Sequence, residues 1–136
     1  MREILFRGKR VDNGEWVQGN LFIPDIDNTP TQICIGTNII RITYDIIPET
    51  IEQYTGLTDK NGKKIFEGDI ISYEDGESYL VTFNGGCFRF GAIEYGNGIK
   101  RYRGFQSFSV DKYNLNEVEV IGNIHDNPEL LGGEKL

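Results

Sequence analysis

The side chains that could perform nucleophilic chemistry in this sequence are few. His125 is the only histidine, and the two cysteines, Cys34 and Cys87, lie in apolar stretches that are typical of strands. A histidine beside a cysteine can generate a thiolate nucleophile, but two buried thiols and a histidine in a turn do not form such a pair. We interpret His125 as a turn residue and both cysteines as free, buried thiols, as is usual in a reducing compartment.

Two acidic residues, Glu67 and Asp69, flank Gly68 and would point to the same side of a strand. A carboxylate pair of this kind can act as a general acid and base or bind a metal. A structural role is favoured, in which Asp69 accepts hydrogen bonds from nearby backbone N–H groups and fixes the turn into the strand. Together with His125 these two acids are the only basis for an enzyme, and we predict no catalytic residue.

The sequence has no recognisable metal or cofactor motif. A structural zinc site needs about four Cys or His ligands, and the chain has two cysteines and one histidine. The segment Asp59-Lys60-Asn61-Gly62 superficially resembles a calcium loop, but it lacks the glycine and glutamate spacing of an EF-hand. Walker A and dinucleotide fingerprints are also absent. We therefore predict no metal and no cofactor.

Basic and aromatic side chains are interleaved near residues 95–105, and this segment is the candidate binding site. Such a cluster on a small β-domain can clamp single-stranded nucleic acid. It can equally contact a peptide or a second subunit. The residues that would make the contact are Tyr95, Lys100, Arg101, Tyr102, Arg103 and Phe105.

The overall charge disfavours nucleic acid as the partner. The 136 residues include 14 Lys and Arg against 21 Asp and Glu, a formal net charge of −7. Residues 1–55 and the remainder are both net acidic, so no basic half is hidden. Because phosphate neutralisation supplies most of the affinity for nucleic acid, a protein partner is favoured, and nucleic acid stays an alternative. The sequence contains no run of 18 apolar residues and no signal-peptide pattern, which predicts a cytoplasmic protein with no membrane span.

The elements that would hold these residues are short strands joined by tight turns. Asn-Gly suits hairpin turns because both residues tolerate a positive φ. Strict alternation from Ile40 to Ile46, through Ile42 and Tyr44, predicts a half-buried strand. Residues 48–54 and 127–131 are each expected to form a short helical turn. The dipeptides that we assign to turns are Asn13-Gly14, Asn61-Gly62, Asn84-Gly85, Asn97-Gly98 and Asp75-Gly76.

Three stretches of the sequence carry recognisable motifs: Ile4–Arg10 with Asn13–Val17, then Gln53–Ile71, and finally Val120–Leu130. Together they resemble the YopX family of phage and prophage proteins, and the resemblance extends over nearly the whole chain. The middle stretch is the most specific part, while about 20–47 and 74–116 match only loosely. The motif residues that we interpret as structural are Tyr54, Gly56, Asp59, Asn61, Gly62, Gly68, Asp69, Gly122, Asn127 and Pro128.

The resemblance implies a fold but no activity, because no established reaction can be transferred residue by residue. The C-terminal part of the family is similar to an SH3-like barrel, which agrees with the series of short strands after residue 65. We predict an all-β protein with an N-terminal β-subdomain of hairpins at 1–50. A turn-rich junction at 51–64 and a small SH3-like barrel at 65–136, ending in a short turn or helix, would follow.

These observations favour an accessory protein of a phage or prophage in the cytoplasm of the bacterial host. It would act as a β-rich protein–protein interaction module on an unidentified host or phage protein. A nucleic-acid-associated module that uses residues 100–105 is the first alternative, and an enzyme is the second. Homo-oligomerisation is also expected, since small β-domains often cover their edge strands in an oligomer.

Overall fold

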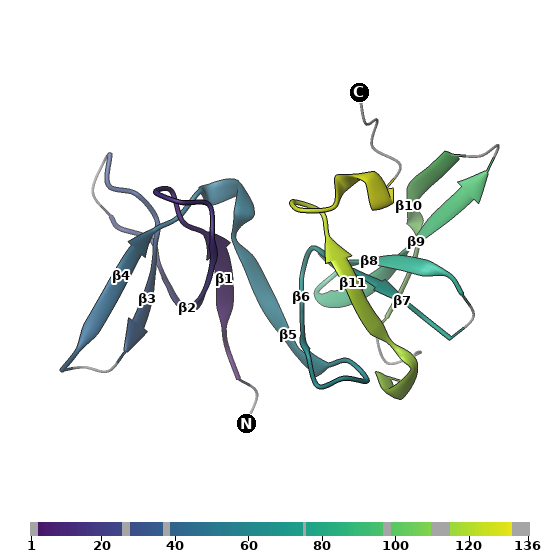
Figure 1. Cartoon of the computed structure of the whole chain (residues 1–136), viewed down its shortest axis with the longest axis horizontal. Coiled ribbons are helices and arrows are strands. Elements are labelled where there is room, and N and C mark those ends of the chain that lie inside the picture. The colour runs from purple at the N-terminus through teal and green to yellow at the C-terminus, as the bar shows by residue number, and fades with distance from the viewer. Residues whose placement is uncertain are drawn as a thin grey trace. The chain divides into compact units, whose positions relative to one another are not determined.

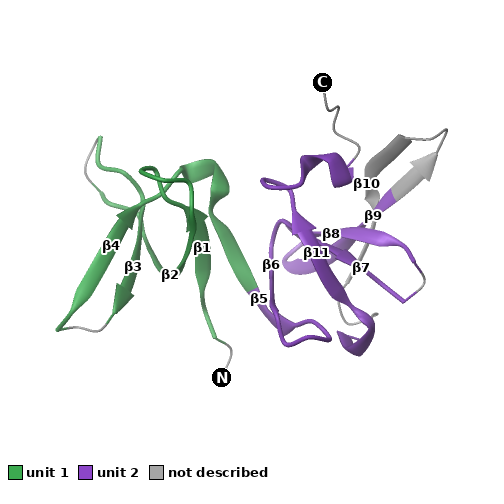
Figure 2. Ribbon diagram, viewed as in Figure 1, with its two compact units in different colours: residues 1–54 green, residues 55–136 purple. Residues whose placement is uncertain are grey.

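The chain is all-β in its computed structural model, which describes residues 3–25, 28–36, 39–74, 76–96, 99–109 and 115–131 (Figure 1). Within 94–109 the description covers the backbone only. The chain divides into two compact units: unit 1, residues 1–54, and unit 2, residues 55–136 (Figure 2). In the described ranges, no helix is long and apolar enough to cross a membrane.

Unit 1 is an antiparallel sheet built from the first strands of the chain. These are β1 (Phe6–Lys9), β2 (Trp16–Phe22), β3 (Gln32–Gly36) and β4 (Arg41–Asp45), followed by the 3₁₀ helix η1 (Pro48–Thr50) and the start of β5 (Glu52–Thr58). The strand order in unit 1 is β4-β3-β2-β1-β5. The predicted first hairpin is confirmed, because β1 and β2 pair across the Asn13-Gly14 turn, where Gly14 has a φ of 72°.

In unit 1 the end of β4 is also hydrogen-bonded to the end of β1 and the segment that follows it. Val11 N–H donates to the Asp45 carbonyl and Ile47 N–H donates to the Lys9 carbonyl, both at 2.9 Å. The last residue of β4 is therefore paired on both sides, with β3 and with the segment after β1. Beneath these strands lies a small core that includes the fully buried side chains of Ile33 and Ile46.

Gly19 in β2 lets β3 approach closely. A Cβ atom at this position would lie 2.5 Å from the Cys34 carbonyl oxygen and 2.9 Å from Cγ2 of Ile33. We expect Gly19→Ala to destabilise the protein by about 1–3 kcal/mol, because a backbone atom cannot move aside as a flexible side chain would. Urea denaturation checks this, with exposed Gln18→Ala as the control. Equal stabilities of the two variants would show that β3 moves away from the added methyl group without loss of stability.

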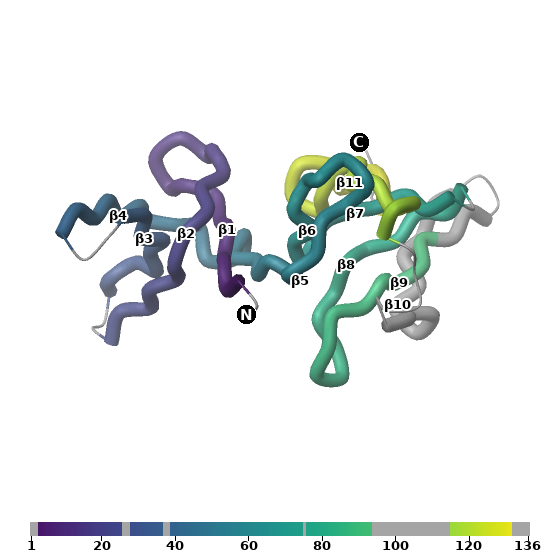
Figure 3. Tube along the Cα trace, turned by 90° about the horizontal axis from the view of Figure 1, so that it is seen from below, coloured from purple at the N-terminus to yellow at the C-terminus, as the bar shows by residue number. Residues whose placement is uncertain are grey.

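Unit 2 contains the rest of β5 and six further strands. They are β6 (Lys64–Phe66), β7 (Asp69–Ser72), β8 (Ser78–Asn84), β9 (Cys87–Gly96), β10 (Ile99–Ser109) and β11 (Glu119–Asn123), with the 3₁₀ helices η3 (Leu115–Glu117) and η4 (Pro128–Leu131). Strands β7 to β10 form an antiparallel meander, and the sheet order is β10-β9-β8-β7-β11. Strand β11 thus runs beside β7 (Figures 1 and 3).

Unit 2 buries apolar side chains on both faces of its sheet, in two clusters. One buried cluster contains Ile65, Ile71, Tyr79, Val81, Phe90 and Val118. A second contains Ile70, Leu80 and Ile93, against which Ile124 and Leu130 pack from the C-terminal segment. An antiparallel meander is consistent with the SH3-like barrel expected from the sequence, and closure of that barrel stays a prediction.

Three details of the local structure differ from the sequence expectation. The helical turn is confined to Pro48–Thr50, and the expected turn-rich junction at 51–64 contains strand β5 as far as Thr58. The turn after β8 is centred one residue later than expected, on Gly85 and Gly86, because Asn84 pairs with Cys87. The proposed turn at Asn97-Gly98 lies outside the described residues, as does Asp75 of the turn between β7 and β8.

The expected burial was wrong for two isoleucines and both cysteines. Ile40 and Ile42 are exposed, whereas Ile33 and Ile46 are buried against β1 near Gly8. Cys34 and Cys87 are free but only half-buried. Cys34 lies on the opposite face of β3 from the buried Ile33. Cys87 begins β9, where Arg89 donates to its sulfur at 3.4 Å.

Candidate interaction site

The candidate segment near residues 95–105 lies in the hairpin of β9 and β10. Its backbone register places Lys100 opposite Tyr95 and Arg101 opposite Glu94. Tyr102 lies opposite Ile93, and the register shifts after Arg103, around Phe105. Strand β10 is an edge of its sheet. The side chains of these candidate residues fall outside the description, so a contact made by them stays a prediction.

Asp59, a residue of the most specific sequence motif, is a buried structural anchor. Its Oδ1 accepts hydrogen bonds from the backbone N–H groups of Asn61 and Lys63, both at 2.9 Å. Its Oδ2 accepts one from Val120 N–H, at 3.0 Å. The first two bonds shape the turn between β5 and β6, where Gly62 has a φ of 79°. The third joins this turn to β11.

The ionisation of Asp59 follows from these contacts. Burial alone would raise the pKa of its carboxyl. The N–H donors of Val120, Lys63 and Asn61 and the positive charge of Lys63 outweigh burial and hold that pKa below its ordinary value. Asp59 is therefore a carboxylate at neutral pH, fully engaged with the backbone.

Other motif residues also have structural roles. The predicted hydrogen bond of Asp69 is present, since Phe66 N–H donates to its Oδ2 at 2.8 Å. Gly68 adopts a φ of 86° in the turn between β6 and β7. Gly122 makes room for Asn127, whose Oδ1 would lie 2.5 Å from an added Cβ and accepts from Asn123 N–H at 3.2 Å.

His125 lies in the turn after β11, as expected, and is half-buried. Its backbone N–H donates to Oδ1 of Asn123 at 3.0 Å. Glu67 is half-buried in the turn between β6 and β7. In the part of the chain whose side chains are described, no group of three or more His, Cys, Asp and Glu residues is arranged to hold a metal ion.

The hairpin of β3 and β4 exposes an apolar surface that sequence reasoning missed. Ile35 and Ile42 are directly opposite each other in the ladder. We call the four residues of this surface the isoleucine patch: Ile35, Ile39, Ile40 and Ile42, which are 40%, 92%, 72% and 52% exposed. A cluster of large apolar side chains on a hairpin is typical of a contact surface.

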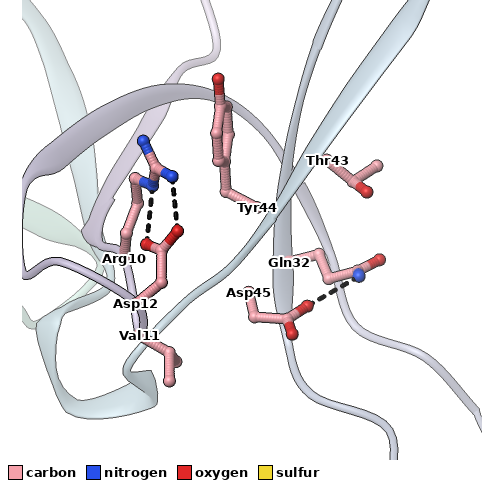
Figure 4. Close-up of a pocket in the computed structure, with 7 residues that line it drawn as sticks. All are labelled: Arg10, Val11, Asp12, Gln32, Thr43, Tyr44 and Asp45. Atoms are coloured by element: carbon pink, nitrogen blue, oxygen red, sulfur yellow. Dashed lines mark hydrogen bonds and ion pairs between the residues drawn. The ribbon is translucent and has the colours of Figure 1, made fainter.

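A pocket of about 360 Å³ lies beside this patch (Figure 4). One wall is the turn after β1, and the other is formed by β3 and β4. The Arg10 guanidinium lies 4.4 Å from the centre of the Tyr44 ring. On the opposite wall, Gln32 Nε2 donates to Asp45 Oδ1 at 2.9 Å. The residues that line the pocket are Arg10, Val11, Asp12, Gln32, Thr43, Tyr44 and Asp45.

The charges of the pocket are only partly balanced. Arg10 Nε donates to Asp12 Oδ1 at 2.9 Å, and its Nη2 also donates to Asp12 Oδ2. Hydrogen bonding with Arg10 lowers the pKa of the Asp12 carboxyl, and hydrogen bonding with Asp12 raises the pKa of Arg10. Asp45, by contrast, accepts a hydrogen bond from the neutral amide of Gln32. The Asp45 carboxylate is therefore suited to pair with a positively charged group of another molecule.

The sequence places the chain in a known protein family. The family model described as YopX protein matches residues 5–132, which include all three motif stretches apart from Ile4. The chain belongs to the YopX family. The YopX match confirms the resemblance drawn from Ile4–Arg10, Gln53–Ile71 and Val120–Leu130. No curated protein matches the sequence.

A solved structure is similar to this YopX-family chain along nearly its whole length. It is the crystal structure of protein EF1440 from Enterococcus faecalis, with 25% sequence identity and a TM-score of 0.46. The similarity covers 96% of this chain and 99% of that one.

Proposed function

We propose that the protein is an accessory protein of a phage or prophage that works in the host cytoplasm by binding another protein chain. Its contact surface is the isoleucine patch together with the adjoining pocket. The observation that carries the proposal is the exposure of four isoleucines on one hairpin. Burying such a surface stabilises a complex by roughly 25 cal/mol per Å² of apolar area before the costs of association.

The surroundings of the buried aspartates argue against catalysis by these groups and so favour a binding role for the protein. Asp69 is one of the two carboxylates considered for acid–base chemistry, and its carboxylate is buried and accepts a backbone N–H. Asp59 is engaged in the same way by three backbone donors. Carboxylates committed to the backbone are poorly placed to exchange protons with a substrate.

Affinity capture from a lysate of the phage-carrying host, with and without nuclease, tests the proposed function. We expect a protein partner that persists after nuclease treatment and is lost with Ile42→Ser. The matched control is Ile121→Ser, because Ile121 is 41% exposed and lies at the bulge of β11 in unit 2, whereas the patch belongs to unit 1. A partner that depends on nucleic acid would favour the cluster at residues 100–105 instead. Equal capture by both variants would contradict a role for the patch.

A further inference from the structure

The edge of β4 that faces away from β3 is only partly paired. Ile46 N–H donates to the Thr31 carbonyl at 2.9 Å, and the ladder continues through Tyr44–Ile33 and Ile42–Ile35. In an antiparallel pair, residues that exchange hydrogen bonds with the partner alternate with residues that do not. Arg41, Thr43 and Asp45 therefore direct their N–H and C=O groups away from β3.

The outward groups of these three residues have different surroundings. The carbonyl of Asp45 accepts from Val11 N–H, as described above. Among the described backbone hydrogen bonds, none reaches the outward groups of Arg41 or Thr43. A short edge with free donors and acceptors, flanked by exposed isoleucines, is a template for one more strand.

We propose that this strand is β4 of a second copy of the chain, paired antiparallel about a two-fold axis at Ile42. The inference rests on the proposed function and names the partner of that surface. In this register Arg41 of each copy pairs with Thr43 of the other through outward backbone groups. Ile42 then faces Ile42 of the second copy, and Ile40 faces Tyr44. Free backbone groups and exposed apolar side chains are covered by the same contact.

The hydrogen bond from Val11 N–H to the Asp45 carbonyl disfavours a register that is shifted towards Asp45. An axis shifted to Thr43 would place the second strand across Asp45, where Val11 already occupies the outward side. With the axis at Ile42, β4 of the second copy does not reach Asp45, because its first residue, Arg41, lies opposite Thr43. A self-complementary edge of this kind forms a closed dimer and not an open fibre.

Charge complementarity supports a second copy as the occupant. On the polar face of β4, Arg41 of the second copy lies diagonal to Asp45, where neighbours are about 7–8 Å apart and within reach of a long side chain. Arg41 is exposed, and Asp45 supplies the carboxylate that lines the pocket. The two Arg41 residues are also diagonal neighbours, and turning towards Asp45 separates them. The symmetry forms this ion pair twice.

Proline at position 43 tests the pairing directly. Because the Thr43 N–H points away from β3, Thr43→Pro removes the intermolecular donor and leaves the ladder within unit 1 intact. Thr43→Ala is the matched control, since it keeps the N–H. In sedimentation velocity with the full chain, we expect the wild type and Thr43→Ala to reach twice the mass of one chain. Thr43→Pro should raise the dimer dissociation constant roughly tenfold or more.

A charge exchange provides a second test if Thr43→Pro does not fold. Arg41→Asp should weaken the dimer, and the double variant Arg41→Asp/Asp45→Arg should restore it. A wild-type chain that is monomeric at every concentration would overturn the inference. If Ile42→Ser nevertheless abolishes capture of another protein, the proposed function stands without the dimer. If the patch affects neither self-association nor capture, both fail.

Discussion

Replacing Glu52 with alanine is expected to destabilise the folded protein by about 3–5 kcal/mol. The Glu52 carboxylate forms an ion pair with Arg7, at 2.7 Å from Nη2 and 2.9 Å from Nε. The side chains of Glu52 and Arg7 are 4% and 9% exposed, respectively. Removing the carboxylate leaves the Arg7 guanidinium, which was desolvated on folding, without this counter-charge. The Trp16 ring, 4.7 Å from Arg7 Cζ, compensates only partly.

Chemical denaturation of Glu52→Ala beside Asp12→Ala measures this effect. Asp12 also pairs with an arginine, Arg10, but its side chain is 65% exposed, so we expect a small change there. The double variant Arg7→Met/Glu52→Leu should recover much of the lost stability, because an apolar pair needs no desolvation of charge. Similar losses in Glu52→Ala and Asp12→Ala would show that burial does not set the strength of the pair.

Replacing Asp59 with alanine should cost about 3 kcal/mol or more, since three backbone N–H groups lose their acceptor. Asparagine at this position should cost less, because its carbonyl oxygen can still accept one or two of these bonds. Thermal unfolding of the two variants measures the difference. If Asp59→Ala lowered the free energy of unfolding no more than a substitution at an exposed position does, water would be replacing the carboxylate as acceptor at the turn.

The contribution of Asp59 should also depend on pH. Its pKa in the folded protein lies below the ordinary value, so the folded state favours the carboxylate. The stabilisation is therefore complete above about pH 4 and is lost as the pH falls through the folded pKa. The free-energy difference between the wild type and Asp59→Asn should shrink in this acidic range. A difference that stays constant on acidification would contradict the assignment.

Local sequence patterns predicted the strands and turns of this protein better than they predicted which side chains are buried. Asn13-Gly14 marked the first hairpin correctly, because the backbone requirement of such a turn is local. The alternation from Ile40 to Ile46 correctly identified residues that share a face of β4. The pattern has no information on how far other strands extend, so it did not distinguish buried Ile46 from exposed Ile42. The exposed isoleucine patch was missed for this reason.

The anchoring role of Asp59 was likewise beyond a local pattern. The adjoining Asn61-Gly62 dipeptide indicated a turn, which the contacts of Asp59 with Asn61 and Lys63 bear out. The bond to Val120 spans 61 positions and leaves no periodic trace in the sequence. Strand β5 was partly assigned to a junction because the residues from Thr55 to Lys64 are typical of turns. The strand nevertheless continues through Gly56, which has a φ of 87°.

The bond between Asp59 and Val120 has a consequence for how unit 2 folds. Strand β11 supplies the edge beside β7 and the third donor to Asp59, although both partners precede it by about fifty or sixty positions. Contacts this distant raise the contact order and slow folding, because a long loop must close before they form. During synthesis, unit 1 has all its sheet partners available within 54 residues, whereas unit 2 must wait for β11 to emerge. A ribosome stalled before residue 119 would therefore carry a finished first unit and an unfinished second one.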